Sequence, residues 1–206
     1  KIKPVLVLID AHAIIHRAYH ALPELTTPNG EPAGALYGVA AMLVKLIKEL
    51  KPDYILAAYD LAGPTHRHEV YEDYKGTRTK TDDALIAQFD RSRDIFEAFH
   101  VPIYDAQGFE ADDVIGTFAE KLKKDFDIII ASGDMDTLQL VDDKRVRVFT
   151  LKKGINDTIL YDEKAVEERY GFKPALLTDY KGLRGDPCEN IIGVKGMCGK
   201  TATKLI

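Results

Sequence analysis

Short apolar runs recur along the chain, and three of them are followed closely by an acid. Residues 4–9, 54–59 and 128–131 are almost entirely apolar. Continuous apolar runs of this length are typical of parallel strands that are buried on both faces. The sequence therefore predicts three core strands, with acids at or near their carboxyl ends: Asp10, Asp60 and Asp134.

The segments between these runs carry apolar residues at helical spacing. Helices are predicted from about residue 12, over 35–50 and 110–123, from about Thr137, and over 162–170 and 174–183. Further strands are predicted at 101–104 and, as an edge strand, at 145–150. Residues 63–100 are highly charged and show no strand pattern. Alternating strands and helices predict an α/β fold whose mostly parallel sheet has helices on both faces.

Composition is consistent with this fold and excludes some classes of protein. The 206 residues are 46% hydrophobic and 30% charged, which indicates one globular domain with a sizeable core. No apolar stretch is long enough to span a membrane, and no signal-peptide pattern opens the chain. Cys188 and Cys198 form neither a disulfide framework nor a zinc pattern. We therefore expect a cytoplasmic protein.

The most informative chemistry is a set of acids that such a sheet brings together. In an open α/β sheet, ligands bind beyond the carboxyl ends of the strands. Like charges gathered there repel each other unless a cation lies among them, and oxygen donors in this number suit Mg²⁺ or Mn²⁺. The pattern predicts a site for two divalent ions, typical of enzymes that cleave or transfer phosphate esters. The nine acids are Asp10, Asp60, Glu110, Asp112, Asp113, Asp134, Asp136, Asp186 and Glu189.

Two acidic motifs also have ordinary structural explanations. The residues 110–113, Glu-Ala-Asp-Asp, start a predicted helix, where the helix dipole stabilises acids. The residues 133–136, Gly-Asp-Met-Asp, follow a strand, where a Gly-Asp turn is common. The first motif has three acids within four residues, and the second has two acids spaced by one residue beside other acidic strand ends. Both patterns favour metal ligands over helix caps and turns.

Other residues suggest alternatives that the pattern does not favour. His12, His16 and His20 have helical spacing and could bind zinc, but no acid or cysteine completes the set nearby, so a polar helix surface is favoured. Cys188 has no base beside it, which argues against a nucleophilic thiol. A haloacid-dehalogenase-like phosphatase needs an acid two residues after Asp10, where His12 stands.

Net charge gives little indication of a nucleic-acid partner, but the distribution of charge does. The formal charge is −5, which the nine acids alone outweigh. Basic residues gather toward the end of the chain, at Lys181, Arg184, Lys195, Lys200 and Lys204. They form either a solvated surface or a contact surface for phosphates.

Motifs in a fixed order run through almost the whole chain: Leu8-Ile-Asp10, Tyr59-Asp60, Arg67-His-Glu69, Tyr74-Lys75, Arg78, Glu110-Ala-Asp-Asp-Val-Ile-Gly-Thr117, Gly133-Asp-Met-Asp136, Gly185-Asp186 and Lys200-Thr-Ala202. In this combination they resemble the 5′ nuclease domains attached to bacterial DNA polymerase I, and more broadly the flap endonuclease family. The resemblance implies a PIN-like 5′ nuclease fold: a central, mostly parallel twisted sheet with helices on both faces, a helical arch, and a carboxyl-terminal helix-three-turn-helix.

The resemblance also implies two regions and their roles. Residues 1–184 would form the nuclease core, with the arch at 63–100 passing a single-stranded 5′ end. Residues 185–206 would form the helix-three-turn-helix, apparently truncated, which grips duplex DNA and binds K⁺. A grip on the backbone alone carries no sequence information.

Residue roles follow by the same resemblance. One divalent ion would be held by Asp10, Asp60, Glu110, Asp112 and Asp113, and the other by Asp134, Asp136, Asp186 and Glu189. The catalytic residues would be Lys75 and Arg78, which contact the scissile phosphate, together with Asp10 and Asp112. DNA contacts would come from Arg67, Tyr74, Lys75, Arg78, Lys195, Gly196, Lys200 and Thr201.

The implied activity is that of a structure-selective, metal-dependent 5′-3′ exonuclease and flap endonuclease. Its substrate would be 5′-flap, nicked or branched duplex DNA, with RNA primers removed during Okazaki-fragment processing and repair. The protein would act as a bacterial, nucleoid-associated monomer. A non-catalytic DNA-binding relative is the alternative, but such a protein is expected to lose several site acids, and all nine positions are acidic here.

Three departures from the family pattern change the expectation. Glu189 stands where the family has Asp, which could move the second ion. Leu61 and Ala62 replace an arch-base Ala-Lys pair, so one lysine is missing. Cys198 replaces a glycine of the turn, and a side chain there is expected to disfavour a positive φ. The sequence thus predicts a weakened K⁺ site.

Overall fold

A six-stranded sheet forms the centre of the molecule. The computed structural model describes residues 2–143, 145–153 and 157–206. The strand order is β3-β2-β1-β4-β5-β6, with β1 and β4 in the middle and every neighbouring pair parallel except β5 and β6. The strands are β1 (Val5–Asp10), β2 (Tyr54–Ala58), β3 (Ile103–Tyr104), β4 (Asp127–Ala131), β5 (Val146–Lys153) and β6 (Asp157–Tyr161). The predicted mostly parallel sheet is confirmed.

The edge of the sheet differs from the prediction. β5 was expected at the edge, but β6 pairs with it antiparallel and takes that place. Only one side chain of β6 is fully buried, Tyr161, and Leu160 beside it is exposed. A five-residue strand with so little buried surface has a weak apolar pattern, because a sheet edge can stay half-solvated.

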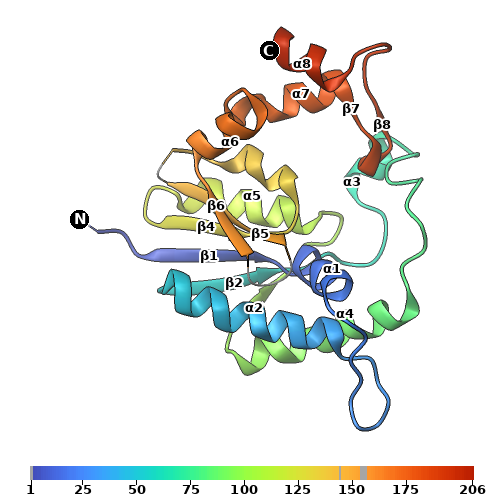
Figure 1. Cartoon of the computed structure of the whole chain (residues 1–206), viewed down its shortest axis with the longest axis vertical. Helices are drawn as coiled ribbons and strands as arrows, with labels where there is room; N and C mark the ends of the chain where they lie inside the picture. Colours follow the sequence, from blue (N-terminus) through green and yellow to red (C-terminus); the bar gives the residue numbers. More distant parts are fainter. Residues whose placement is uncertain (1, 144, 154–156) are drawn as a thin grey trace.

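Helices cover both faces of the sheet, as predicted (Figure 1). Successive side chains of a strand point to opposite faces, so Val7 and Ile9 join one core, whereas Leu6 and Leu8 join the other. The first core is closed by α1 (Ala11–Ala21), α2 (Gly34–Leu50) and α4 (Asp83–Ala98). The second is closed by α5 (Ala111–Leu122), η1 (Met135–Leu140), α6 (Glu163–Tyr170), η2 (Pro174–Leu176) and α7 (Leu177–Arg184).

The charged segment 63–100 consists of two parts that differ in burial. Its first part contains a short helix, α3 (His66–Val70), with no buried residue. Its last part is α4, which buries Leu85 and Phe96 in the first core and packs against α2. α4 therefore belongs to the core, and only residues 63–82 are left for the expected arch. The high charge of α4 concealed its narrow apolar stripe.

The carboxyl-terminal part is a compact unit at one end of the molecule (Figure 1). It contains α7, β7 (Gly185–Asp186), η3 (Pro187–Glu189), β8 (Ile191–Ile192) and α8 (Gly199–Leu205). β7 pairs antiparallel with β8, and α7 packs against α8. Gly185 has φ +85, and a Cβ on it would meet the Gly193 nitrogen at 2.5 Å, so this crossing requires glycine. Because α7 packs on α8, the expected boundary at residue 185 falls within this unit.

Membrane insertion finds no support in the helices. Among the residues described, no helix combines the length and the apolar character that crossing a bilayer requires.

Candidate active site

The carboxyl edge of the sheet gathers acids because neighbouring parallel strands end there together. Asp10 is the last residue of β1, Asp60 follows β2, and Asp134 follows β4. Asp10 also caps α1, since its Oδ1 accepts the Ala13 N–H at 3.0 Å. The strand end and the helix start thus orient one oxygen of this carboxylate through a local contact.

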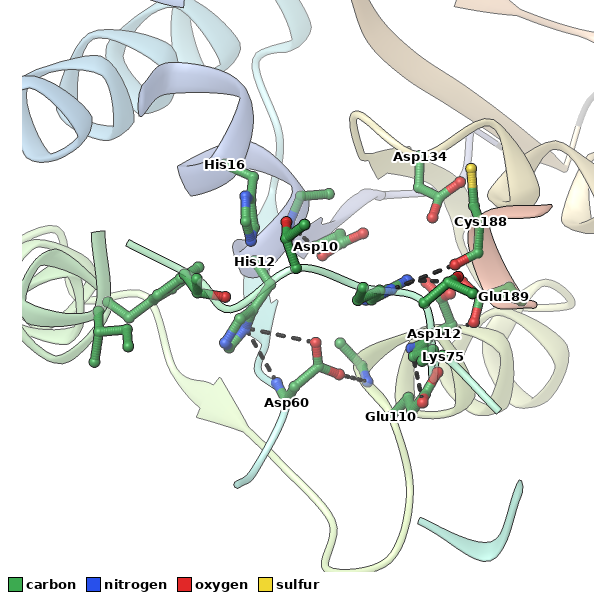
Figure 2. Close-up of a pocket in the computed structure, with 18 of the residues that line it drawn as sticks. Asp10, His12, His16, Asp60, Lys75, Glu110, Asp112, Asp134, Cys188 and Glu189 are labelled. Carbon is green, nitrogen blue, oxygen red and sulfur yellow. Dashed lines mark hydrogen bonds and ion pairs between the residues drawn. The ribbon is translucent and has the colours of Figure 1, made fainter. Parts of the chain in front are cut away.

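A cavity of about 830 Å³ opens at this edge (Figure 2). Six of the nine predicted acids line it, from three strand ends, the start of α5 and η3. Lys75 and Arg78 line it too, and Ile86 and Phe89 of α4 add an apolar wall. The six acids are Asp10, Asp60, Glu110, Asp112, Asp134 and Glu189.

Hydrogen bonds fix the acids at the floor of the cavity. Ser132 Oγ donates to Asp10 Oδ2 at 2.7 Å, and the Ala111 N–H at the start of α5 donates to Asp60 Oδ1 at 2.6 Å. Burial raises the pKa of Asp10 to about 6, with the hydrogen bonds from Ala13 and Ser132 opposing the rise and the charges of Asp60 and Asp134 adding to it. The folded state therefore works against the charge of this carboxylate.

Asp112 is the most perturbed of these acids. Burial raises its pKa first, and the negative charges of Asp10, Asp134, Asp60 and Asp136 add to the effect, bringing the pKa to about 8. Ionising Asp112 beside four other carboxylates costs electrostatic free energy. A bound cation would lower that cost.

The basic side chains of the cavity are paired with its acids. Lys75 Nζ lies 2.8 Å from Glu110 Oε1 and 3.7 Å from Glu189 Oε2. Arg78 donates to Glu189 Oε1 at 2.8 Å. Lys75 has φ +58, an uncommon conformation for a residue with a side chain. Its backbone is held by a hydrogen bond from the Lys75 N–H to the Glu189 carbonyl at 3.1 Å.

Three predicted ligands lie outside this cavity. Asp113 accepts a bidentate pair of hydrogen bonds from Arg67, at 2.7 and 2.8 Å. That pairing overcomes the effect of burial and lowers the pKa of Asp113. Asp136 and Asp186 share the ammonium of Lys181 instead. The structure thus commits these three acids to ion pairs.

The donor set fits hard divalent cations. The cavity presents carboxylate oxygens, which Mg²⁺ and Mn²⁺ prefer, and Glu189 Oε2 is buried without a hydrogen-bond partner. Within the described residues no three acids, histidines or cysteines converge as closely as a metal cluster requires. Lysine and arginine instead hold Glu110, Glu189, Asp136 and Asp186. Residues able to hold ions are therefore present, but several of them are engaged in ion pairs with lysine and arginine.

Sequence reasoning missed several residues of the site. His12 was taken for a helix-surface residue, yet it lines the cavity, stacks on Phe89 with ring centroids 4.5 Å apart, and accepts the Asp60 N–H at Nδ1. Its burial lowers the pKa. The sequence also did not predict Ser132 and Lys181 as site residues. A serine just after the third core strand was the only signal for Ser132.

Apart from Lys75 and Arg78, which line the cavity, the residues predicted to contact DNA fall into two groups. Arg67 and Tyr74 turn inward: Arg67 pairs with Asp113, and the buried Tyr74 donates to Glu110 at 3.2 Å. The second group lies exposed around the turn between β8 and α8: Lys195, Gly196, Lys200 and Thr201. The first group therefore orders the acids, whereas the second is free to meet a ligand.

The conformation of Cys198 removes one reason to expect a weakened K⁺ site at the turn between β8 and α8. Its φ is −99 and its ψ is 165, an extended conformation that any residue adopts. The positive φ of this turn lies at Gly196, at +81. The premise that Cys198 needs a glycine conformation is wrong.

Comparison with known proteins identifies the family of the chain. Residues 5–171 match the family described as the 5′-3′ exonuclease, N-terminal resolvase-like domain. The chain is 42% identical over 205 residues to DNA polymerase I of Bacillus caldotenax, covering 99% of this chain and 23% of that protein. The chain therefore spans about a quarter of that relative's length.

Solved structures give the same picture of the fold. The bacteriophage T5 5′-exonuclease with bound zinc superposes with a TM-score of 0.78 at 23% identity, covering 98% of this chain and 74% of that one. A T5 flap endonuclease in a pseudo-enzyme-product complex with DNA and metal ions superposes with a TM-score of 0.77 at 23% identity, with the same coverage. The predicted 5′ nuclease fold is confirmed.

Proposed function

Because the chain belongs to the family of 5′-3′ exonuclease N-terminal, resolvase-like domains, we propose that it hydrolyses phosphodiester bonds near the 5′ ends of branched DNA. The observation that carries the proposal is the cavity in which six acids face Lys75 and Arg78. An acidic floor suits divalent cations, and basic residues at its wall suit the phosphate that those cations would hold. The T5 relative that was solved with DNA and metal ions supports this assignment.

Two divalent ions, Mg²⁺ or Mn²⁺, would supply the acidified water and the charge compensation that phosphodiester cleavage needs at neutral pH. Asp10, Asp60, Glu110 and Asp112 would hold one of them. Asp134, Asp136, Asp186 and Glu189 would hold the second. We leave Asp113 out of both sets, because Arg67 already satisfies both of its oxygens.

Lys75 and Arg78 act on the substrate phosphate. Each of them is paired with a cavity acid, so each is already oriented toward the position a phosphate would take. As the scissile phosphate gains negative charge, these two cations stabilise it more strongly than they stabilise the starting phosphate. The wall of Ile86 and Phe89 offers the adjoining sugar and base an apolar surface.

The arch and the turn would then select the shape of the substrate. Within residues 63–82, the stretch from Lys75 to Thr81 contributes to the lining of the cavity, and we propose that a single-stranded 5′ end passes beneath this segment. Lys195, Gly196, Lys200 and Thr201 would grip the duplex through its phosphates, with K⁺ bound at the turn. A grip of this kind reads structure rather than sequence.

The wider role follows from the same chemistry. We propose that 5′-flap and nicked duplexes are the substrates, that RNA primers at 5′ ends are removed during Okazaki-fragment processing and repair, and that the protein works as a cytoplasmic monomer.

A 5′-labelled flap substrate tests the proposal directly. Cleavage near the junction is expected with Mg²⁺, and none is expected with EDTA or on a duplex that carries only a 3′ flap. Duplex binding without cleavage in Mg²⁺ and in Mn²⁺ would favour the non-catalytic DNA-binding alternative. A haloacid-dehalogenase-like phosphatase is not supported, because the acid it needs is replaced by His12, whose ring accepts the Asp60 N–H.

A further inference from the structure

A lysine lies between two of the acids expected to bind the second ion. Lys181 is on α7, and its Nζ donates to Asp186 Oδ2 at 2.6 Å. The same ammonium pairs with Asp136 Oδ1. The Lys181 side chain is 28% exposed, so most of it is withdrawn from solvent. One ammonium thereby serves both carboxylates.

The arrangement is built by the fold rather than by a flexible surface contact. Asp136 belongs to η1, Asp186 ends β7, and α7 packs against both of these elements. Asp186 is fixed from its other side, since its Oδ1 accepts the Cys188 N–H at 3.1 Å. Three elements therefore converge on the Lys181 ammonium.

Lys181 differs from the other lysine of the site. Lys75 lines the cavity where the substrate phosphate would lie. When substrate binds, the Lys75 ammonium can therefore exchange its carboxylate partner for that phosphate. Lys181 is not among the residues that line this cavity. Its partners are the two acids, and it carries the charge that a bound ion would carry.

We propose that Lys181 is a tethered counter-ion that occupies the cation position between Asp136 and Asp186, so that a divalent ion binds this pair only by displacing the ammonium. The inference rests on the proposed function, which calls for a second ion at these acids. It makes Lys181 a positioning residue, because the ammonium keeps the pair assembled before the ion arrives. It also makes the second ion bind more weakly than the first.

The physical reason is competition between two cations for the same oxygens. Displacement breaks two charge-assisted hydrogen bonds. The flexible stem of lysine lets the ammonium retreat toward solvent, yet it stays near the ion and repels it. Removing the charge of Lys181 should therefore strengthen binding of the second ion by at least about tenfold.

The test is a Mn²⁺ titration of the whole chain without DNA, followed by electron paramagnetic resonance. The wild type should show one tighter and one weaker class of site. In K181M, the weaker class should tighten about tenfold or more, with the tighter class unchanged. K181R, which keeps the charge, should match the wild type. The control K164M removes a charge from an exposed lysine that pairs only with Glu168 in this part of the chain.

A second readout separates a counter-ion from a passive surface lysine. Without metal, K181M should melt at a lower temperature than K164M, because Asp136 and Asp186 then face each other without a cation. Added Mn²⁺ should restore the melting temperature of K181M. If K181M does not fold, K181Q takes its place in both measurements.

Two outcomes would overturn the inference. A titration of K181M that coincides with the wild type means that Lys181 does not compete with the ion, and a weaker second site means that Lys181 supports the ion instead. If the wild type cleaves the 5′ flap and either outcome is seen, the function stands and only the inference fails. If the wild type neither binds Mn²⁺ nor cleaves, the proposed function itself fails.

Discussion

The acids of the cavity are held in an electrostatic environment that opposes their charge. Asp112 is the clearest case, because burial and four neighbouring carboxylates bring its pKa to about 8 from an ordinary 3.8. The folded, metal-free protein thus binds this proton more tightly than the unfolded chain. The contribution of Asp112 to the stability of the folded state is fully present at low pH and is lost as the pH rises from about 4 to about 8.

D112N is predicted to stabilise the metal-free protein and to abolish cleavage. An asparagine cannot ionise, so the variant should melt at least about 3 °C above the wild type in EDTA at pH 8. The difference should shrink toward pH 4, where the wild-type carboxyl is protonated in both states. Calorimetry at several pH values, with 5′-flap cleavage assays beside it, measures both effects. Unchanged melting at pH 8, or wild-type cleavage, would contradict this role for Asp112.

Lys75 and Arg78 are predicted to matter more for the chemical step than for binding. Each forms an ion pair with an acid of the cavity, so K75A and R78A should slow single-turnover cleavage by at least about 100-fold. Duplex affinity, measured by fluorescence anisotropy, should change by less than about tenfold. R91A is the matched control, because Arg91 pairs with Glu31 and Asp94 on an exposed face. Equal losses in rate and affinity would show that these residues only hold the substrate.

Among the secondary elements, the base of the arch is tied to the segment that carries Glu189. Asn190 Nδ2 donates to the Asp73 carbonyl at 2.8 Å, and Tyr71 Oη donates to the Asn190 carbonyl at 3.1 Å. Asn190 has φ +58, a conformation that asparagine and glycine adopt most readily. These contacts place Lys75 beside Glu110 even though the arch buries little apolar surface.

Substitution of Asn190 should separate the effect of its side chain from that of its backbone. N190G keeps the positive φ and loses only the bond to Asp73, so it should slow cleavage and expose residues 71–82 to protease. N190A adds backbone strain of about 1 kcal/mol and should also melt below N190G. N29A, at an exposed loop, serves as the control. Protease cuts within α4 instead of 71–82 would contradict the assignment of α4 to the core.

Across the molecule, the chemistry and the duplex grip are assigned to different places. The acids lie at the carboxyl edge of the sheet, whereas Lys195 lies on the turn before α8 and Lys200 lies in the first turn of α8. Phosphate contacts release counterions, so duplex affinity should fall steeply with salt. The distance between the two places makes binding and cleavage separable by mutation.

K200A is predicted to weaken all duplex sequences alike. One lost phosphate contact should reduce the slope of log affinity against log salt by about 0.9. Single-turnover cleavage at saturating DNA should stay near the wild-type rate. K204A, which removes a charge further along α8, is the control for net charge. An unchanged slope would show that Lys200 does not meet a phosphate.

The same titrations test the turn that carries Cys198. The backbone at Cys198 is extended, so the cysteine does not prevent the turn from adopting the conformation expected to bind K⁺. We therefore expect K⁺ to tighten duplex binding relative to Na⁺ at equal ionic strength. C198G should change this preference by less than about twofold. Wild-type binding that ignores the choice of cation, with a preference restored in C198G, would instead support a site closed by the cysteine.

The core strands, the parallel sheet and the acids at its rim follow from the sequence alone. Apolar runs and helical spacing are local patterns, and parallel strands bring their carboxyl ends to one edge whatever the details. Asp10, Asp60, Glu110, Asp112 and Asp134 could be placed together on that ground. The family motifs added Lys75 and Arg78, which no local pattern singles out.

Only the tertiary structure decided which charged residues form ion pairs with one another. Arg67 was expected to face DNA but neutralises Asp113, and Lys181 takes up Asp136 and Asp186. Such pairings join residues far apart in the chain, 46 positions between Arg67 and Asp113 and 111 between Arg78 and Glu189. They depend on how α3, α5 and α7 pack. The place of α4 in the core and of β6 at the edge was settled in the same way. Their burial depends on neighbouring elements, and a local pattern of apolar residues does not carry that information.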